Sequence, residues 1–71
     1  MNRNACYEIC VNGRLEERWL RWFEGHTVTY LDNGTTLIVL TAVDQPALFG
    51  VLNRIRDLGL ELILVQKGDL G

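Results

Sequence analysis

The fold of this 71-residue chain is decided by the stretch "TAVDQPALFGVLNRIRDLGLELILV", residues 41–65. An apolar segment runs into Asp44, Gln45 and Pro46, after which apolar side chains recur at helical spacing as far as "DLGL". Asp44 or Gln45 stands where the N-cap of a helix belongs, and the fixed φ of Pro46 suits a first helical turn. Because apolar segments flank this helix on both sides, the stretch predicts a β-α-β unit with its helix over residues 45–58.

The remainder of the chain supplies a second unit of the same kind. "CYEICV" alternates as a strand does, and the stripe formed by Leu15, Trp19, Trp22 and Phe23 has the spacing of a helix. The "NG" pair in "VTYLDNGTTLIVL" is the preferred two-residue turn of a β-hairpin. The expected elements are strands near residues 5–11, 26–32, 35–42 and 60–66 and helices near residues 14–24 and 45–58.

The element order β-α-β-β-α-β predicts the fold class. With right-handed crossovers and a central hairpin, such a chain forms a four-stranded antiparallel sheet with two helices on one face, the ferredoxin-like plait of the α+β class. A length of 71 residues allows one domain, so residues 1–71 are expected to form a single ferredoxin-like domain. A chain this short buries a small share of its surface, which favours association with another chain.

A two-residue turn at Asn33 and Gly34 also predicts which side chains the helices leave uncovered. It would set Tyr30 opposite Leu37 and thereby fix the register of the hairpin. The uncovered face of the sheet would then carry Leu31, Ile38 and Leu40, with Cys6 and Cys10 beside them. Monomeric proteins rarely expose a large contiguous apolar patch. We therefore expect a homodimer that forms through this face or through an edge strand.

Charge and hydropathy bear on the class of partner. The net charge of −2 gives no broad attraction to nucleic-acid phosphates or to anionic membranes, so neither is expected as a partner. No apolar segment approaches the ~20 residues that span a bilayer, and the first fourteen residues have no signal-peptide pattern. The protein is accordingly expected in the cytoplasm, where its thiols stay reduced.

The residues that could carry chemistry do not form a recognisable catalytic set. Cys6 and Cys10 would lie roughly 13 Å apart in a strand, too far for a disulfide or a shared zinc ion. His26 is the single histidine and could act as a general base, but no pattern pairs it with a nucleophile. The carboxylates stand among arginines in the helical or edge segments, which is typical of a solvated surface; they are Glu16, Glu17, Glu24, Asp57 and Glu61. We expect neither an enzyme nor a cofactor or metal site.

Residues 37–66, with "VDQPALFGVLNRIRDLGLELILV", resemble a β-α-β unit of ACT domains, which are small amino-acid-sensing regulatory modules. Those domains carry an Asp-x-Pro-Gly-Leu-type turn between strand and helix, on their first β-α-β unit. Here Ala47 replaces the glycine, and the motif lies on the second unit. The resemblance implies a small-molecule effector near the helix start or in a subunit interface, at Asp44, Gln45, Pro46, Ala47 and Leu48.

A second resemblance covers most of the chain. The pattern "DNGTTL" followed by "VDQPAL" and "RIRDLGLEL" is similar to stretches of a set of short uncharacterised bacterial proteins. It implies the same plait and a bacterial origin, and it assigns no activity. Two hypotheses of function follow from the sequence: a non-enzymatic, homodimeric interaction or structural module, or alternatively an ACT-like small-molecule-sensing module.

Overall fold

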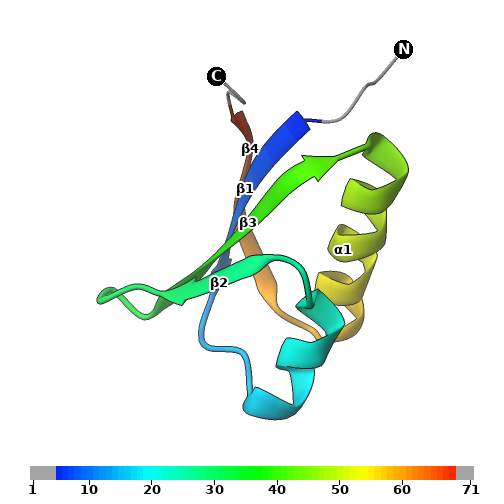
Figure 1. The fold of residues 1–71 in the computed structure, drawn as a ribbon. Coiled ribbons are helices and arrows are strands. Elements are labelled where there is room, and N and C mark those ends of the chain that lie inside the picture. The colour runs from blue at the N-terminus through cyan, green and yellow to red at the C-terminus, as the bar shows by residue number, and fades with distance from the viewer. Residues whose placement is uncertain (1–4, 69–71) are drawn as a thin grey trace.

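The computed structural model of the protein describes residues 5–68, and its elements follow the predicted order (Figure 1). Residues 1–4 and 69–71 of the predicted domain lie outside the described residues. The first helix is a short 3-10 helix instead of a longer α-helix. The elements are β1 (Ala5–Asn12), η1 (Glu17–Phe23), β2 (Thr27–Tyr30), β3 (Thr35–Val43), α1 (Gln45–Asp57) and β4 (Glu61–Gly68).

The four strands form one sheet in the order β2-β3-β1-β4, in which all neighbouring pairs are antiparallel. The η1 connection joins β1 to β2 across β3, and α1 joins β3 to β4 across β1. Both helices lie on one face of the sheet (Figure 1), and we call the opposite face the outer face. The prediction of an α+β chain with four antiparallel strands and two helices is confirmed.

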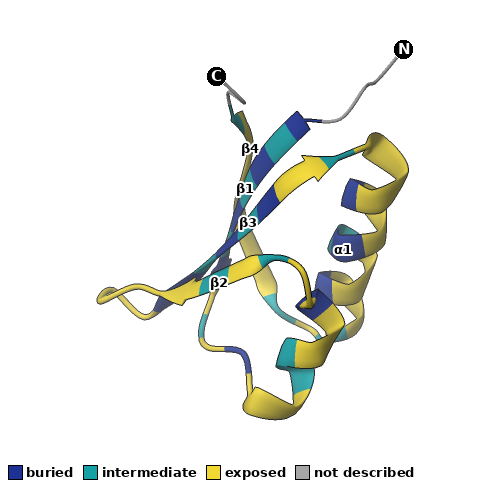
Figure 2. Cartoon of the chain, in the orientation of Figure 1, coloured by how far each residue is buried: buried dark blue, intermediate teal, exposed yellow. Residues whose placement is uncertain are grey.

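The core lies between the sheet and the two helices (Figure 2). β1 alternates as a half-buried strand does, since Tyr7, Ile9 and Val11 are buried and the residues between them are less so. The buried apolar residues are Ala5, Tyr7, Ile9, Val11, Leu15, Phe23, Ile38, Leu40, Leu48, Val51 and Ile55. They come from both β-α-β units, so neither unit has a core of its own.

The connection between β2 and β3 is longer than the predicted two-residue turn. The Gly34 N–H donates to the Leu31 carbonyl at 3.2 Å, and the Leu31 N–H donates to the Thr35 carbonyl at 2.9 Å. Gly34 has a left-handed φ of +84°, whereas Asn33 does not have a positive φ. The turn is therefore not the type that needs positive φ at both central positions. The loop consists of residues 32–34 and ends on a left-handed glycine.

The additional loop residue shifts the register of the hairpin. Tyr30 lies opposite Thr36 instead of Leu37, and Val28 lies opposite Ile38. Because side chains alternate along a strand, a shift of one residue moves every side chain of β3 to the other face of the sheet, relative to the side chains of β2. The predicted register is thus wrong by one residue.

Ile38 and Leu40 are core residues as a consequence of this shift. Both are 0 % exposed, so the prediction that they line an uncovered face is wrong. Leu37 and Val39, which are half-buried, occupy the outer face of β3 in their place. Leu31 lies between the end of β2 and this loop and is exposed.

The turn gives a first testable prediction at Gly34. Its φ of +84° places any β-branched side chain in strained backbone. Gly34→Val should lower the free energy of unfolding by about 1–3 kcal/mol, as measured by urea denaturation. Gly34→Asn is the matched control, because asparagine tolerates the left-handed region. Equal effects of the two substitutions would show that backbone strain is not the cause.

Ala42 gives a second prediction, of the opposite sign. It has a φ of +56° where the register between β1 and β3 shifts by one residue. Left-handed backbone costs an alanine about 1–2 kcal/mol, and glycine costs about 0.5–1 kcal/mol of additional chain entropy. Ala42→Gly should therefore raise the free energy of unfolding by up to about 1 kcal/mol. Ala42→Val should lower it in the same denaturation assay, and a gain in stability for valine would contradict this explanation.

Candidate functional site

The turn before α1 was one of the two candidate sites predicted from the sequence. Asp44 has extended backbone, and its Oδ1 accepts a hydrogen bond from the Ala47 N–H at 2.9 Å. Pro46 lies in the first helical turn, as predicted. Leu48 is buried in the core, so its side chain is not available to a ligand on the surface. The interpretation of Asp44 as a helix cap is confirmed, while binding of an effector by residues 44–48 stays a prediction.

The cap predicts a measurable loss of stability. Asp44→Ala removes the acceptor of the Ala47 N–H and should lower the free energy of unfolding by about 0.5–2 kcal/mol. Asp44→Asn is the control, because its side-chain oxygen can accept the same hydrogen bond. Thermal and urea unfolding measure both variants. If alanine and asparagine destabilise equally, the lost charge and not the lost cap is responsible.

A groove lies between the end of η1 and the side of α1 that runs from Ala47 to Arg54. It has a volume of about 290 Å³, and Arg54 helps to shape it by donating from Nη1 to the Trp22 carbonyl at 2.8 Å. Gly50 contributes an open stretch of helix, because a Cβ added there would meet nothing within 4 Å. The residues that line the groove are Trp22, Glu24, His26, Ala47, Gly50, Val51 and Arg54.

Two residues that the sequence analysis considered for binding or catalysis line this groove. They are Ala47 of the predicted effector site and His26, whereas Glu24 was assigned to a solvated surface. His26 lies immediately before β2, and its buried Nδ1 has no hydrogen-bond partner among residues 5–68. Sequence reasoning missed the groove because it depends on how the short η1 packs against α1. One signal was present: Gly50 interrupts a helix where alanine would be more favourable by about 0.5–1 kcal/mol.

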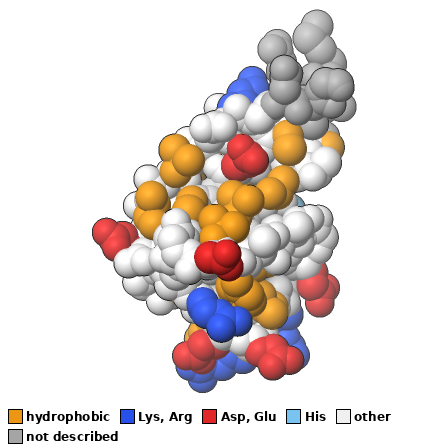
Figure 3. All heavy atoms as spheres, turned by 90° about the vertical axis from the view of Figure 1, so that its left-hand side faces the viewer, with side chains coloured by type: hydrophobic (Ala, Val, Ile, Leu, Met, Phe, Trp, Pro, Cys, Tyr) orange, Lys and Arg blue, Asp and Glu red, His pale blue; other side chains and the backbone are white. Residues whose placement is uncertain are grey.

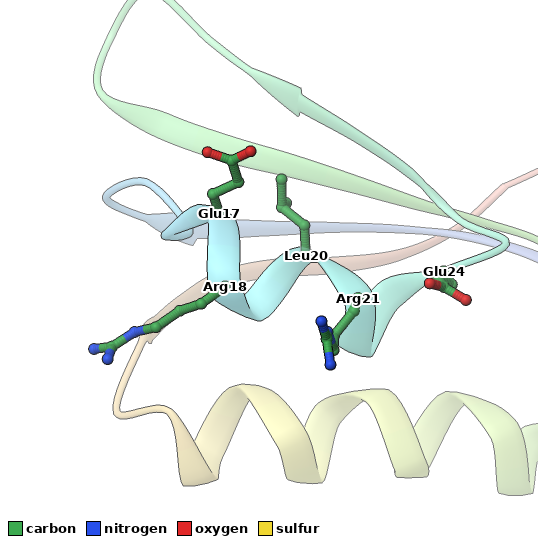
Figure 4. A pocket seen from close by; sticks show the side chains of 5 residues that line it. All are labelled: Glu17, Arg18, Leu20, Arg21 and Glu24. Carbon is green, nitrogen blue, oxygen red and sulfur yellow. The ribbon is translucent and has the colours of Figure 1, made fainter.

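A second hollow lies along η1, but the side chains that line it do not converge on one point. Glu17 and Leu20 point to one side of the helix, whereas Arg18 and Arg21 point to the other (Figure 4). Arg18 also lies 2.6 Å from Glu16 in an exposed ion pair. Side chains that diverge in this way are typical of a solvated surface, which agrees with the pattern of charges in the sequence.

The edge strand β4 is the most exposed apolar element that the structure describes. Its residues 61–67 are all exposed, and the four consecutive apolar side chains from Leu62 to Val65 are 36–52 % exposed. β4 has β1 as its single neighbour, so one of its two edges has no partner strand in the described chain. An exposed, apolar edge strand offers unpaired backbone groups to another strand.

The outer face continues the apolar surface of β4 onto the neighbouring strands (Figure 3). Directly opposite residues of an antiparallel sheet share a face, and Cys10 lies opposite both Leu64 and Leu37. These three residues form a row across β4, β1 and β3, which we call the apolar row. Next to it, the Gln66 Nε2 donates to Glu8 Oε1 at 3.3 Å.

The cysteines occupy the face that the sequence predicted for them. Cys6 and Cys10 alternate with the buried side chains of β1, so both point to the outer face, where they are half-buried free thiols. Cys10 is the centre of the apolar row. Of the five predicted interface residues, these two remain on the uncovered face, while Ile38 and Leu40 do not.

Two further features of residues 5–68 concern membranes and metal ions. No helix in this part of the chain is long and apolar enough to cross a membrane. The same residues contain no group of three or more histidine, cysteine, aspartate or glutamate side chains placed to hold a metal ion.

Comparison with known proteins gave one match. The model of a family described as "Domain of unknown function (DUF8691)" matches residues 6–66, from β1 to β4. The comparisons with curated proteins and with solved structures gave no match.

Proposed function

This chain belongs to the DUF8691 family, and we propose that it is a non-enzymatic interaction module that forms a homodimer through β4 and the adjoining outer face. The observation that carries the proposal is the run of exposed apolar side chains on an edge strand, Leu62 to Val65. We further assign the module to the bacterial cytoplasm, where Cys6 and Cys10 stay reduced.

The position of β4 explains why another strand is the partner that fits it best. Leu62 and Val65 lie opposite the buried residues Val11 and Ile9, on the face of the helices, whereas Leu64 lies on the outer face. The strand therefore exposes apolar groups on both faces, as well as an unpaired edge. A second strand satisfies the backbone groups of the edge and covers side chains on both faces at once.

A second copy of the same chain is the occupant that we propose for this edge. Most soluble oligomers are homo-oligomers, and a two-fold dimer places the same patch of each subunit against the other. An antiparallel strand pair has this symmetry, because each strand meets its own copy in reverse. The short chain also gains the additional buried surface that it needs for stability.

We also assign the fold to the ferredoxin-like plait. The strand order supports the assignment, because each β-α-β unit encloses one antiparallel strand between its two strands, as in a split β-α-β unit. In this arrangement β2 and β4 are the two edges. β2 has four residues, whereas β4 has eight, so β4 offers the longer edge for pairing.

Sedimentation equilibrium over a range of protein concentrations tests the proposal. A homodimer should sediment with twice the mass of the chain and dissociate to the single mass on dilution. A chain that stays at the single mass up to millimolar concentration would overturn the proposal. The exposed apolar edge of β4 would then not mediate self-association.

The groove between η1 and α1 favours a second function, the binding of a small molecule as implied by the ACT-like resemblance. Gly50 supports this alternative. A side chain at this position would have room, and alanine would stabilise the helix more than glycine does, so folding does not explain the glycine. Thermal unfolding with a panel of amino acids and small carboxylates tests it. A ligand should raise the melting temperature in a dose-dependent manner, and Gly50→Leu should abolish the effect by filling the groove.

A further inference from the structure

An irregularity in β4 limits how a second strand can pair with it. Cys10 lies opposite Leu64 and Val11 lies opposite Leu62, so Ile63 has no partner on β1. This residue forms a β-bulge, in which one strand has one residue more than its neighbour. As a result, Leu62 and Val65 share a face even though they are three residues apart.

A two-fold axis perpendicular to the sheet keeps each face of one copy continuous with the same face of the other. Residues that meet across the axis must therefore lie on the same face. With Ile63 unpaired, an axis at Leu64 meets this condition, because it sets Leu64 against the partner's Leu64 and Leu62 against the partner's Val65. An axis at Val65 also meets the condition, but it would set apolar residues against polar ones, Leu64 against the partner's Gln66 and Leu62 against the partner's Lys67.

With the axis at Leu64, the polar residues on either side of Leu62 to Val65 also lie opposite polar residues of the partner. Glu61 then meets the partner's Gln66, and both lie on the outer face, opposite Asn12 and Glu8 of β1. Asn12 Nδ2 donates to Glu61 Oε1 at 3.0 Å, and one N–H of Gln66 Nε2 is used by Glu8. An amide nitrogen has two N–H donors, so the second is available to the partner's Glu61.

We propose that β4 pairs antiparallel with β4 of a second copy, with the two-fold axis at Leu64, so that two four-stranded sheets join into one of eight strands. This inference rests on the proposed function and specifies its register. The apolar row of Leu37, Cys10 and Leu64 then runs without interruption into the partner's apolar row. Glu61 and Gln66 close each end of the paired segment with a hydrogen bond between the subunits.

Disulfide cross-linking tests the register. Directly opposite residues of an antiparallel pair have Cα atoms about 4.5–5.5 Å apart, within the range of a disulfide. In a background of Cys6→Ser and Cys10→Ala, Leu64→Cys should cross-link to its own copy under mild oxidation at least about tenfold faster than Val65→Cys, because the partner of Val65 is Leu62 and not Val65. A mixture of Leu62→Cys and Val65→Cys chains should cross-link to each other.

A charge substitution gives a second readout that does not depend on the cysteine variants. Gln66→Glu places a carboxylate between Glu8 and the partner's Glu61, and it should weaken dimerisation by about tenfold at low salt. Gln66→Ala should have a smaller effect that salt does not change. Equal effects of the two substitutions would contradict the contact between Gln66 and Glu61.

The outcomes separate the register from the proposed function. If the wild-type chain has twice the single mass but cross-links fastest through another residue, the register is wrong and the homodimer stands. If the wild-type chain is a monomer at millimolar concentration, both the proposed function and the register are overturned.

Discussion

Replacing Leu40 with alanine should lower the free energy of unfolding by about 2–5 kcal/mol, as expected for a buried leucine. Leu40 is 0 % exposed and packs in the core between the sheet and the helices. The loss includes the free energy of transfer of the side chain and the cost of the cavity that remains. A domain of this length has little stability in reserve, so a large part of the Leu40→Ala protein should be unfolded at room temperature.

Leu37→Ala is the matched control, because Leu37 lies on the same strand and points to the outer face. Both substitutions are made together with Leu64→Lys, so that association does not contribute to the measured stability. Urea denaturation followed by circular dichroism should show a much smaller loss for Leu37→Ala. A larger loss at Leu37 than at Leu40 would mean that the hairpin has the register with a two-residue turn.

Leu64→Lys alone should raise the dissociation constant of the homodimer by at least about 100-fold. The substitution removes an apolar side chain from each copy at the proposed axis and sets two ammonium groups against each other. Like charges directly opposite in a sheet are unfavourable, and the loss of apolar burial adds to this effect. Sedimentation equilibrium measures the dissociation constant.

Phe49→Lys is the control for this substitution. Phe49 lies on α1 and is 55 % exposed, which is comparable to the 49 % of Leu64. The Phe49→Lys substitution changes the charge and the exposed apolar surface by an amount similar to that of Leu64→Lys, but at a position away from β4. We expect its dissociation constant to equal that of the wild type. An equal loss of association for both variants would show that general surface hydrophobicity, and not the edge of β4, drives dimerisation.

The order of strands and helices could be predicted from the sequence because the signals for them are local, although the first helix is 3-10 and shorter than predicted. Alternation marks "CYEICV" as a strand, and Asp44 and Pro46 mark the start of α1 within a single turn. The register of the hairpin could not be predicted, because it depends on the choice between two turn types. Asn33 Oδ1 accepts hydrogen bonds from the N–H and the hydroxyl of Thr35, and this contact accompanies the longer loop.

The candidate surfaces were less predictable than the fold. "LELILV" reads as a strand, but its place at the edge of the sheet follows from the strand order, which is a property of the whole chain. The bulge at Ile63 has no local sequence signal such as a glycine. The groove near His26 likewise depends on the packing of η1 against α1. The cysteines were placed correctly because alternation along β1 alone decides their face.

Amide hydrogen exchange, followed by NMR at protein concentrations below and above the midpoint of dimerisation, tests the association through β4 most directly. On association, the amides of β4 that point away from β1 should become protected, because the second copy supplies their acceptors. The amides of β2, the other edge strand, should exchange at the same rate in both samples. A dimer that forms while the β4 amides stay unprotected, or that protects β2 instead, would contradict the proposed interface.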